Sequence, residues 1–114
     1  MSDLTSMDSL HQTLLDRFDD LGAKRKSSAD QKMKDACLVE LNEVLHRIDL
    51  TQNLLLVAVT AALQNALQEV QTADAQVTAD IRQIADVAKF IQSVSDFLGY
   101  VDKAIDLAKQ AALI

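Results

Sequence analysis

Two residue pairs in this sequence have a spacing that can hold a metal ion. Glu43-x-x-His46 and Asp8-x-x-His11 each place an acid three residues before a histidine. On a helix these positions share one side, as in the Glu-x-x-His elements of four-helix di-iron carboxylate proteins. Such a centre also needs inward carboxylates from two other helices, and the apolar pattern of this chain offers only Asp80. The sequence therefore lacks the full ligand set of that kind of metal centre.

Ordinary surface positions explain Glu43 and His46 more simply. Arg47 follows Glu43 by one helical turn, which is the spacing of an ion pair along a helix surface. His46 also lies away from the apolar positions Leu41 and Leu45. We therefore expect a solvated His46, no metal ligands and no cofactor.

Cys37 is the only cysteine, so the chain has no intramolecular disulfide. It lies next to Leu38 and one turn before Leu41, and no histidine stands one turn away to activate the thiol. Glycine-rich phosphate loops and dinucleotide fingerprints are also missing from the sequence. We expect Cys37 to be a small buried side chain, and we predict no catalytic residues and no enzymatic activity.

The charge balance disfavours nucleic acid as a partner. Eleven Lys and Arg residues stand against 17 Asp and Glu residues, giving a formal net charge of −6. Phosphate binding requires a surplus of cations, which only one segment provides. This basic segment contains Lys24, Arg25, Lys26, Lys32 and Lys34 against a single acid, Asp30. The segment could attract phosphates or acidic lipid. The simpler interpretation is that its charges keep a linker and the start of the next helix solvated.

The composition predicts an all-α protein with one domain over residues 1–114. Proline is absent, glycine occurs twice and aromatic residues make up 4% of the chain, whereas β-rich folds need turn residues and aromatic or β-branched strands. We expect disorder in residues 1–7 and a short helix over residues 8–21, with Gly22 as its left-handed C-cap. Residues 22–28 are expected to form a linker, followed by a capping box at Ser28 that starts the second helix.

Apolar residues continue from there at alternating intervals of three and four, the pattern of helices that pack at a shallow angle. One register contains Leu38, Leu41, Leu45, Ile48, Leu55 and Val59, and a second runs from Leu56 to Ala112 with Asp80 as its one polar member. A single helix of that length could not bury its own apolar face. We expect a break at residues 71–80, or more weakly at 49–53, with Gly99 tolerated inside the last helix. The predicted fold is a coiled-coil-like three-helix bundle, in which long helices from residue 29 to the low seventies and from 79 to 112 form an antiparallel hairpin.

Residues 50–68 carry no charge, so a helix through them is expected to be surrounded by other helices. One copy of so small a chain cannot easily surround it. We therefore predict a helical interaction or oligomerisation module whose partner is a second copy, another helical protein, or both. The expected interface residues are Leu55, Leu56, Val59, Leu63, Val70, Ile84, Ile91, Leu98 and Ile105.

A membrane-active protein that inserts residues 50–68 conditionally, such as a toxin or translocator component, is the alternative function. The continuous apolar run covers only residues 54–63, well short of the roughly 20 residues that span a bilayer. The first nine residues lack the basic and apolar regions of a secretion signal, which favours a cytoplasmic location and leaves signal-independent export open.

Overall fold

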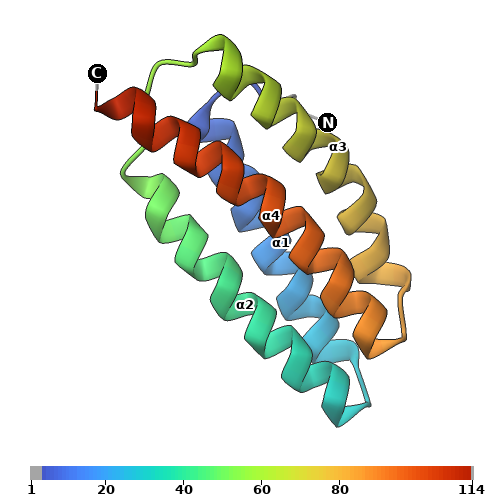
Figure 1. Ribbon diagram of the computed structural model, residues 1–114. Helices are drawn as coiled ribbons and strands as arrows, with labels where there is room; N and C mark the ends of the chain where they lie inside the picture. The colour runs from blue at the N-terminus through green and yellow to red at the C-terminus, as the bar shows by residue number, and fades with distance from the viewer. Residues whose placement is uncertain (1–3, 114) are drawn as a thin grey trace.

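Four α-helices make up the computed structural model of this chain, which describes residues 4–113 (Figure 1). No strand occurs among these residues, so the predicted all-α class is confirmed. The helices are α1 (Met7–Ser27), α2 (Gln31–Gln52), α3 (Ala61–Gln83) and α4 (Val87–Ala112).

The helices form two antiparallel hairpins that pack against each other. Helix α1 pairs with α2, and α3 pairs with α4. Across the two hairpins α1 packs on α3 and α2 packs on α4, so α2 and α3 occupy opposite corners of the bundle (Figure 1). Residues 53–60 connect these corners by crossing one end of the molecule. The bundle measures 48 × 22 × 21 Å.

Each helix begins at a polar side chain that accepts a hydrogen bond from the first turn. These N-cap residues are Ser6, Asp30, Thr60 and Asp86. An N-cap satisfies backbone N–H groups that have no partner within the helix, which contributes about 1 kcal/mol. In a chain without proline, these caps mark the places where helices begin.

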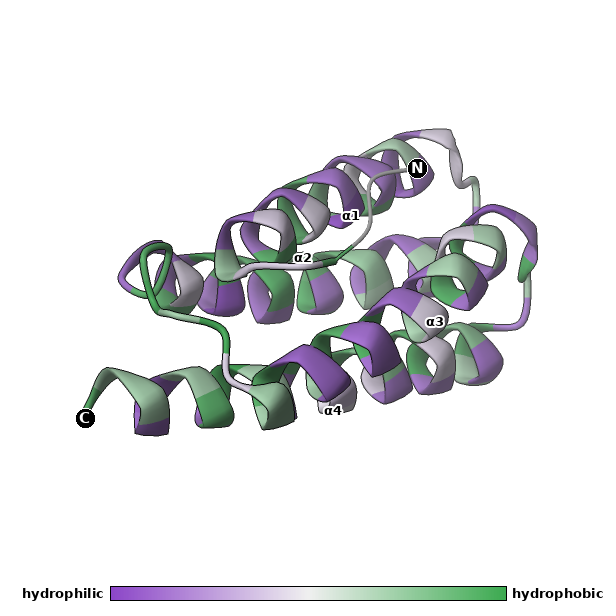
Figure 2. Ribbon diagram, turned by 90° about the horizontal axis from the view of Figure 1, so that it is seen from above, coloured by the Kyte–Doolittle hydropathy of each residue, from purple (hydrophilic) through white to green (hydrophobic). Residues whose placement is uncertain are grey.

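All four helices contribute to one apolar core. Along every helix, apolar residues recur between polar ones, as expected for helices that bury one side (Figure 2). The largest fully buried side chains are Phe90, Phe97, Met7, Leu10, Leu14, Leu21, Leu63, Leu67, Ile81, Ile105, Val44 and Val70. Burial stabilises the fold by about 1.5–3 kcal/mol for each large apolar side chain, before the cost of ordering the chain.

The predicted three-helix arrangement is wrong, because the chain breaks at residues 53–60 and 84–86 and not at 71–80. Helix α3 passes through 71–80 without interruption. The polar residues there bind neighbouring helices: Asp74 and Thr78 accept hydrogen bonds from Arg17, and Asp80 accepts one from Ser93. The weaker candidate break, at 49–53, lies beside the actual crossing loop. The polar side chains of residues 71–80 suggested a loop in the sequence. Their hydrogen bonds to other helices, which keep them in a helix, depend on the tertiary structure and cannot be read from the sequence.

The N-terminal region also differs from expectation. Helix α1 continues to Ser27, so residues 22–27 are helical and Gly22 is not a C-cap. Asp30, not Ser28, caps α2. The segment expected to be disordered includes residues 1–3, which lie outside the described residues, but Leu4 is 3% exposed and its N–H donates to Gln71 Oε1 at 3.0 Å.

Gly22→Ala is expected to stabilise the protein. Gly22 has no positive φ, and a Cβ added there would meet no atom within 4 Å. Alanine in a helix interior is about 0.5–1 kcal/mol more favourable than glycine, so the urea midpoint should rise. Gly99→Ala, equally free of contacts, is the matched comparison. A lower midpoint for Gly22→Ala would instead indicate the left-handed cap that the sequence suggested.

Candidate interaction surface

The two histidines lie in different environments, and neither forms the acid–histidine pair suggested by spacing. His11 is buried, and its Nδ1 lies 2.7 Å from Thr51 Oγ1. Because the Thr51 hydroxyl donates to the Ile48 carbonyl, the Nδ1–H of His11 is the donor in this contact. Asp8 and His46 are exposed, which confirms the expectation for His46.

Glu43 belongs to an ion-pair group that joins the two hairpins. Arg47 binds Glu43 Oε2 at 3.0 Å, which confirms the predicted pair, and also binds Asp102 of α4 through two nitrogens at 2.8 and 2.9 Å. Across the bundle, Arg17 of α1 binds Asp74 of α3 at 2.6 Å. The two-nitrogen contact of Arg47 with Asp102 fixes the relative placement of the two helices more strongly than a single exposed pair does.

The Cys37 thiol is fully buried, as expected, and burial raises its pKa. A raised pKa disfavours the thiolate, which is the reactive form of cysteine. Within residues 4–113, no group of three or more His, Cys, Asp or Glu side chains is placed to hold a metal ion.

The expected interface residues fall into three environments. Leu63, Val70, Leu98 and Ile105 are at most 4% exposed, so they pack inside the single chain and are not available to a partner. Leu55 and Ile84 are half-buried. Leu56, Val59 and Ile91 are exposed to solvent. The heptad spacing thus describes mainly the packing between helices of one copy.

The uncharged segment 50–68 is not one surrounded helix. Residues 53–60 form the crossing loop, and only residues 61–68 belong to α3. Leu54 is 7% exposed and anchors the loop on the core, whereas Leu56 is completely exposed. The loop and the C-terminal end of α4 lie at the same end of the bundle (Figure 2). One copy can therefore bury most of the long apolar pattern without a second copy.

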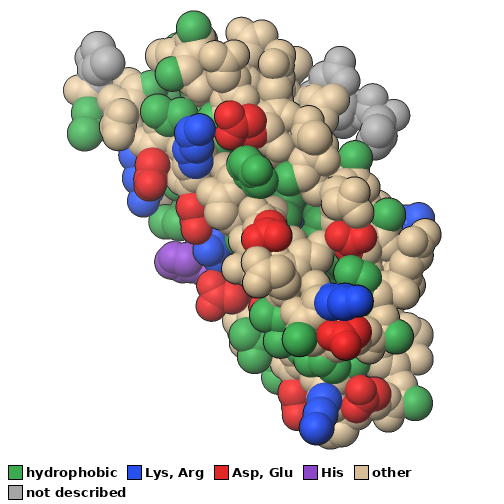
Figure 3. All heavy atoms as spheres, turned by 45° about the vertical axis from the view of Figure 1, so that its right-hand side comes forward, with side chains coloured by type: hydrophobic (Ala, Val, Ile, Leu, Met, Phe, Trp, Pro, Cys, Tyr) green, Lys and Arg blue, Asp and Glu red, His purple; other side chains and the backbone are tan. Residues whose placement is uncertain are grey.

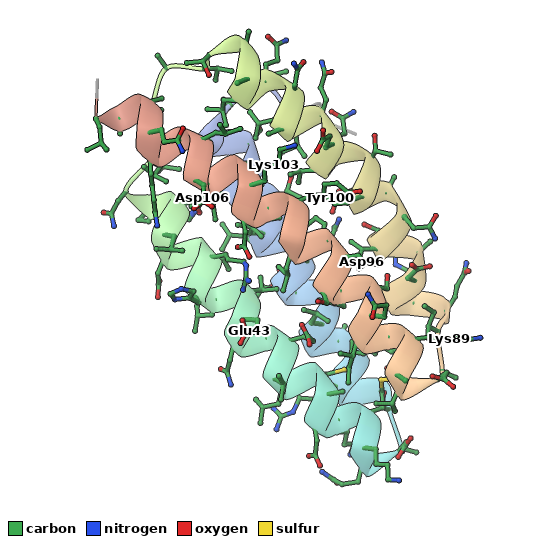
Figure 4. All side chains as sticks on the ribbon, viewed as in Figure 1. Glu43, Lys89, Asp96, Tyr100, Lys103 and Asp106 are labelled. Carbon is green, nitrogen blue, oxygen red and sulfur yellow. The ribbon has the colours of Figure 1, made fainter. Side chains whose placement is uncertain are left out.

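Two hollows of about 900 Å³ each lie along the groove between α3 and α4, and Tyr100 lines both of them. The lining of the groove mixes Lys89 and Lys103 with acidic residues, and the space-filling view shows acids, bases and apolar side chains interspersed on this face (Figure 3). Lys103 and Tyr100 lie on the α3 side of α4 (Figure 4), where Lys103 pairs with Glu69 at 3.4 Å. This groove shows no consistent chemistry that selects a ligand.

A more uniform surface lies along α2. Leu38 and Leu45 are 42% and 44% exposed, and the half-buried Leu41 lies between them on the same side of the helix. Positions separated by three or four residues are neighbours on a helix surface. We call this row, with Lys34 and Asp49 at its ends, the α2 stripe.

Helix α1 extends the apolar area beside the α2 stripe. Phe18 lines the same hollow of about 620 Å³ as Leu41 and Lys34, and Leu15 lies one turn earlier on α1. Both α1 side chains are only partly buried against the core. Together with the three leucines of the α2 stripe they form an apolar surface that no helix of the same chain covers.

One end of this surface is basic. Arg25, Lys26 and Lys34 line the hollow together with one acid, Asp19, and none of the three cations forms an ion pair with a described residue. Lys24, from the same basic segment, instead donates to the Ile84 carbonyl at 2.9 Å and lies over the Phe90 ring. The expected linker is therefore wrong, because residues 24–27 belong to α1. Arg25, Lys26 and Lys32 are exposed, as expected for a solvated segment.

The sequence contained a signal for the α2 stripe that the expected interface left out. Leu38, Leu41 and Leu45 belong to the first heptad register, together with Ile48. The structure buries Ile48 but leaves Leu38 and Leu45 exposed. A heptad register in which some residues are buried and others stay exposed indicates a surface that another helix can cover.

Comparisons with protein-family models, curated proteins and solved structures gave no match to this chain. Among residues 4–113, no helix combines the length and the apolar character that crossing a bilayer requires.

Glu40→Gln is expected to raise the melting temperature at pH 7. Glu40 is 6% exposed, and burial, followed by the negative charge of Glu43, raises the pKa of its carboxyl. The fold therefore favours the protonated form. That stabilisation is fully present below the ordinary pKa and is lost as the pH rises through the raised pKa. Removing the buried charge should add on the order of 1 kcal/mol at pH 7, or about 4 °C.

Thermal unfolding followed by circular dichroism at pH 7 and at about pH 4 tests this expectation, since the carboxyl is largely neutral at the lower pH. The gain from Glu40→Gln should shrink at the lower pH. Glu69→Gln is the control, because Glu69 is exposed and its loss removes only a surface pair with Lys103. Equal gains at both pH values would contradict a charge effect at Glu40.

Proposed function

We propose that this protein is a non-enzymatic helical interaction module that binds another helix along the surface formed by α1 and α2. The single observation that carries the proposal is the α2 stripe, whose leucines keep helix-packing spacing but remain exposed at Leu38 and Leu45. Helices dock in apolar grooves through side chains spaced at three, four and seven residues. The surface of α1 and α2 offers that spacing, with Phe18 at its edge.

The surrounding residues support a binding role over a purely structural one. Leu38 and Leu45 lie outside the apolar core, which is filled by side chains from all four helices. Large apolar areas on a soluble surface commonly mark interaction sites. The basic residues Arg25, Lys26 and Lys34 at one end would set the orientation of a bound helix through charge.

A stapled amphipathic peptide of about four turns, with leucines at the a and d heptad positions, tests this proposal. Its fluorescence anisotropy should rise on titration with the wild-type protein. The double variant Leu38→Glu/Leu45→Glu should lose at least about tenfold in affinity, because two charges would be buried without partners. Since neither leucine belongs to the buried core, the variant should keep its helical circular dichroism.

Val39→Glu is the matched control, because Val39 is 57% exposed on the same helix but lies off the α2 stripe. It should bind the peptide as the wild type does. Peptide binding that is absent from the wild type, or equal in the Leu38→Glu/Leu45→Glu variant, would refute the proposal.

Contact with a membrane surface is the second candidate function, and one observation favours it. Leu56 is fully exposed at the tip of an uncharged loop, and Leu113 is 88% exposed. An apolar loop of this kind can enter the interface of a bilayer without spanning it. The core side chains Leu54 and Leu63 could stay buried in this mode, unlike in full insertion.

Dye-filled vesicles of anionic lipid distinguish insertion from surface contact at pH 7 and about pH 5. Insertion predicts dye release that Leu56→Asp abolishes. Surface contact predicts co-sedimentation with the vesicles, reduced by Leu56→Asp, without release. Lower pH should strengthen binding, because protonated carboxylates reduce the repulsion from acidic lipid. Absence of both release and co-sedimentation at both pH values would exclude this candidate.

A further inference from the structure

Two residue pairs of the α2 stripe are placed symmetrically about one point on the helix: Leu38 with Leu45, and Lys34 with Asp49, whereas Leu41 has Asn42 at its matching position. Lys34, Leu38, Leu41, Leu45 and Asp49 follow one another at intervals of four, three, four and four residues. The centre of the stripe lies between Leu41 and Asn42. Lys34 and Asp49 lie equally far from that centre, about 11 Å along the helix axis at 1.5 Å per residue, and they carry opposite charges.

We propose that the α2 stripe is the interface of an antiparallel homodimer, so that the helix bound by this module is α2 of a second copy. This inference rests on the proposed function and adds the identity of the partner. When two copies of α2 lie antiparallel about a two-fold axis, Leu38 faces Leu45 of the second copy. Lys34 then faces Asp49 of the second copy, and the same pair recurs on the other side of the axis.

The charges at the two ends favour this arrangement over a parallel one. A parallel pair in register would place Lys34 beside the second copy's Lys34 and Asp49 beside the second copy's Asp49, which is repulsive. The antiparallel pair replaces both repulsions with attractions. Arg25 and Lys26, which share the hollow with Lys34, add positive charge at the end that receives Asp49 of the second copy.

The participating charges are free to form these contacts. Neither Lys34 nor Asp49 takes part in an ion pair with any residue between 4 and 113. Arg17 and Arg47, by contrast, are occupied in contacts between the hairpins. The α2 stripe therefore keeps its complementary charges on an apolar surface that the fold leaves uncovered.

The size of the surface predicts a reversible dimer. Helix α2 has 22 residues and is about 33 Å long at 1.5 Å per residue. The bundle is 22 Å wide, so the face formed by α1 and α2 covers on the order of 700 Å², close to the roughly 800 Å² per partner of a stable interface. With leucines at its centre and charge pairs at its ends, such an interface should dissociate on dilution.

Sedimentation equilibrium from about 1 to 100 µM, the range that suits an interface of this size, should show monomer and dimer with no larger species. Leu38→Glu should abolish the dimer while the melting temperature stays close to that of the wild type. Val39→Glu is the matched control and should leave the dimer unchanged, because Val39 is exposed off the α2 stripe.

A charge-reversal experiment tests the antiparallel register. Lys34→Asp alone, or Asp49→Lys alone, places like charges opposite each other twice in the dimer and should weaken association about tenfold. An equimolar mixture of the two variants restores opposite charges at both ends, so heterodimers should form with close to wild-type affinity. A structural role of either residue within its own copy would not produce this rescue.

The outcomes separate this inference from the proposed function. A monomer throughout the concentration range that still binds the stapled peptide at the α2 stripe would overturn the homodimer and leave a different helical partner. A dimer insensitive to Leu38→Glu, or one that shows no rescue in the mixture, would overturn the antiparallel register. Loss of both dimer and peptide binding would overturn both proposals.

Discussion

Each of the four helices has to bury one apolar face, and the rest of the structure depends on this constraint. The chain must therefore turn three times so that the four faces meet. Breaks at residues 28–30 and 84–86 and the loop at 53–60 bring the faces together. No proline enforces these breaks. They occur where Asp30, Thr60 and Asp86 cap the next helix, and where continued helix would have left apolar residues in water.

The arginine contacts between the hairpins follow from this packing. Short connections bring α1 against α2 and α3 against α4, whereas a longer loop, residues 53–60, connects the two hairpins along the chain. Arg17 and Arg47 each bind a carboxylate on the opposite hairpin, at 2.6 and 2.8 Å. Burial raises the pKa of Asp74, although the positive charge of Arg17 opposes that shift. The carboxyl of Asp74 is therefore partly shielded from water.

One copy of the chain fills the core of the bundle, and a few apolar side chains remain exposed on its surface. The functional proposals rest on these exposed side chains. Leu38 and Leu45 of the α2 stripe and the fully exposed Leu56 are apolar residues that lie outside the buried core. The α2 stripe differs from Leu56 because opposite charges, Lys34 and Asp49, lie equally far from its centre. That placement allows a second copy to complement it.

The sequence by itself determined the all-α class, the helical spacing, the buried Cys37, the exposed His46 and the Glu43–Arg47 pair, because each depends on local composition or on residues one turn apart. Only the tertiary structure decided where the helices end, which leucines are exposed and which polar residues serve as contacts. Asp74, Thr78 and Asp80 resembled a loop until their partners Arg17 and Ser93 were placed beside them. A heptad pattern states that a residue packs against some helix, and the fold decides whether that helix belongs to the same chain.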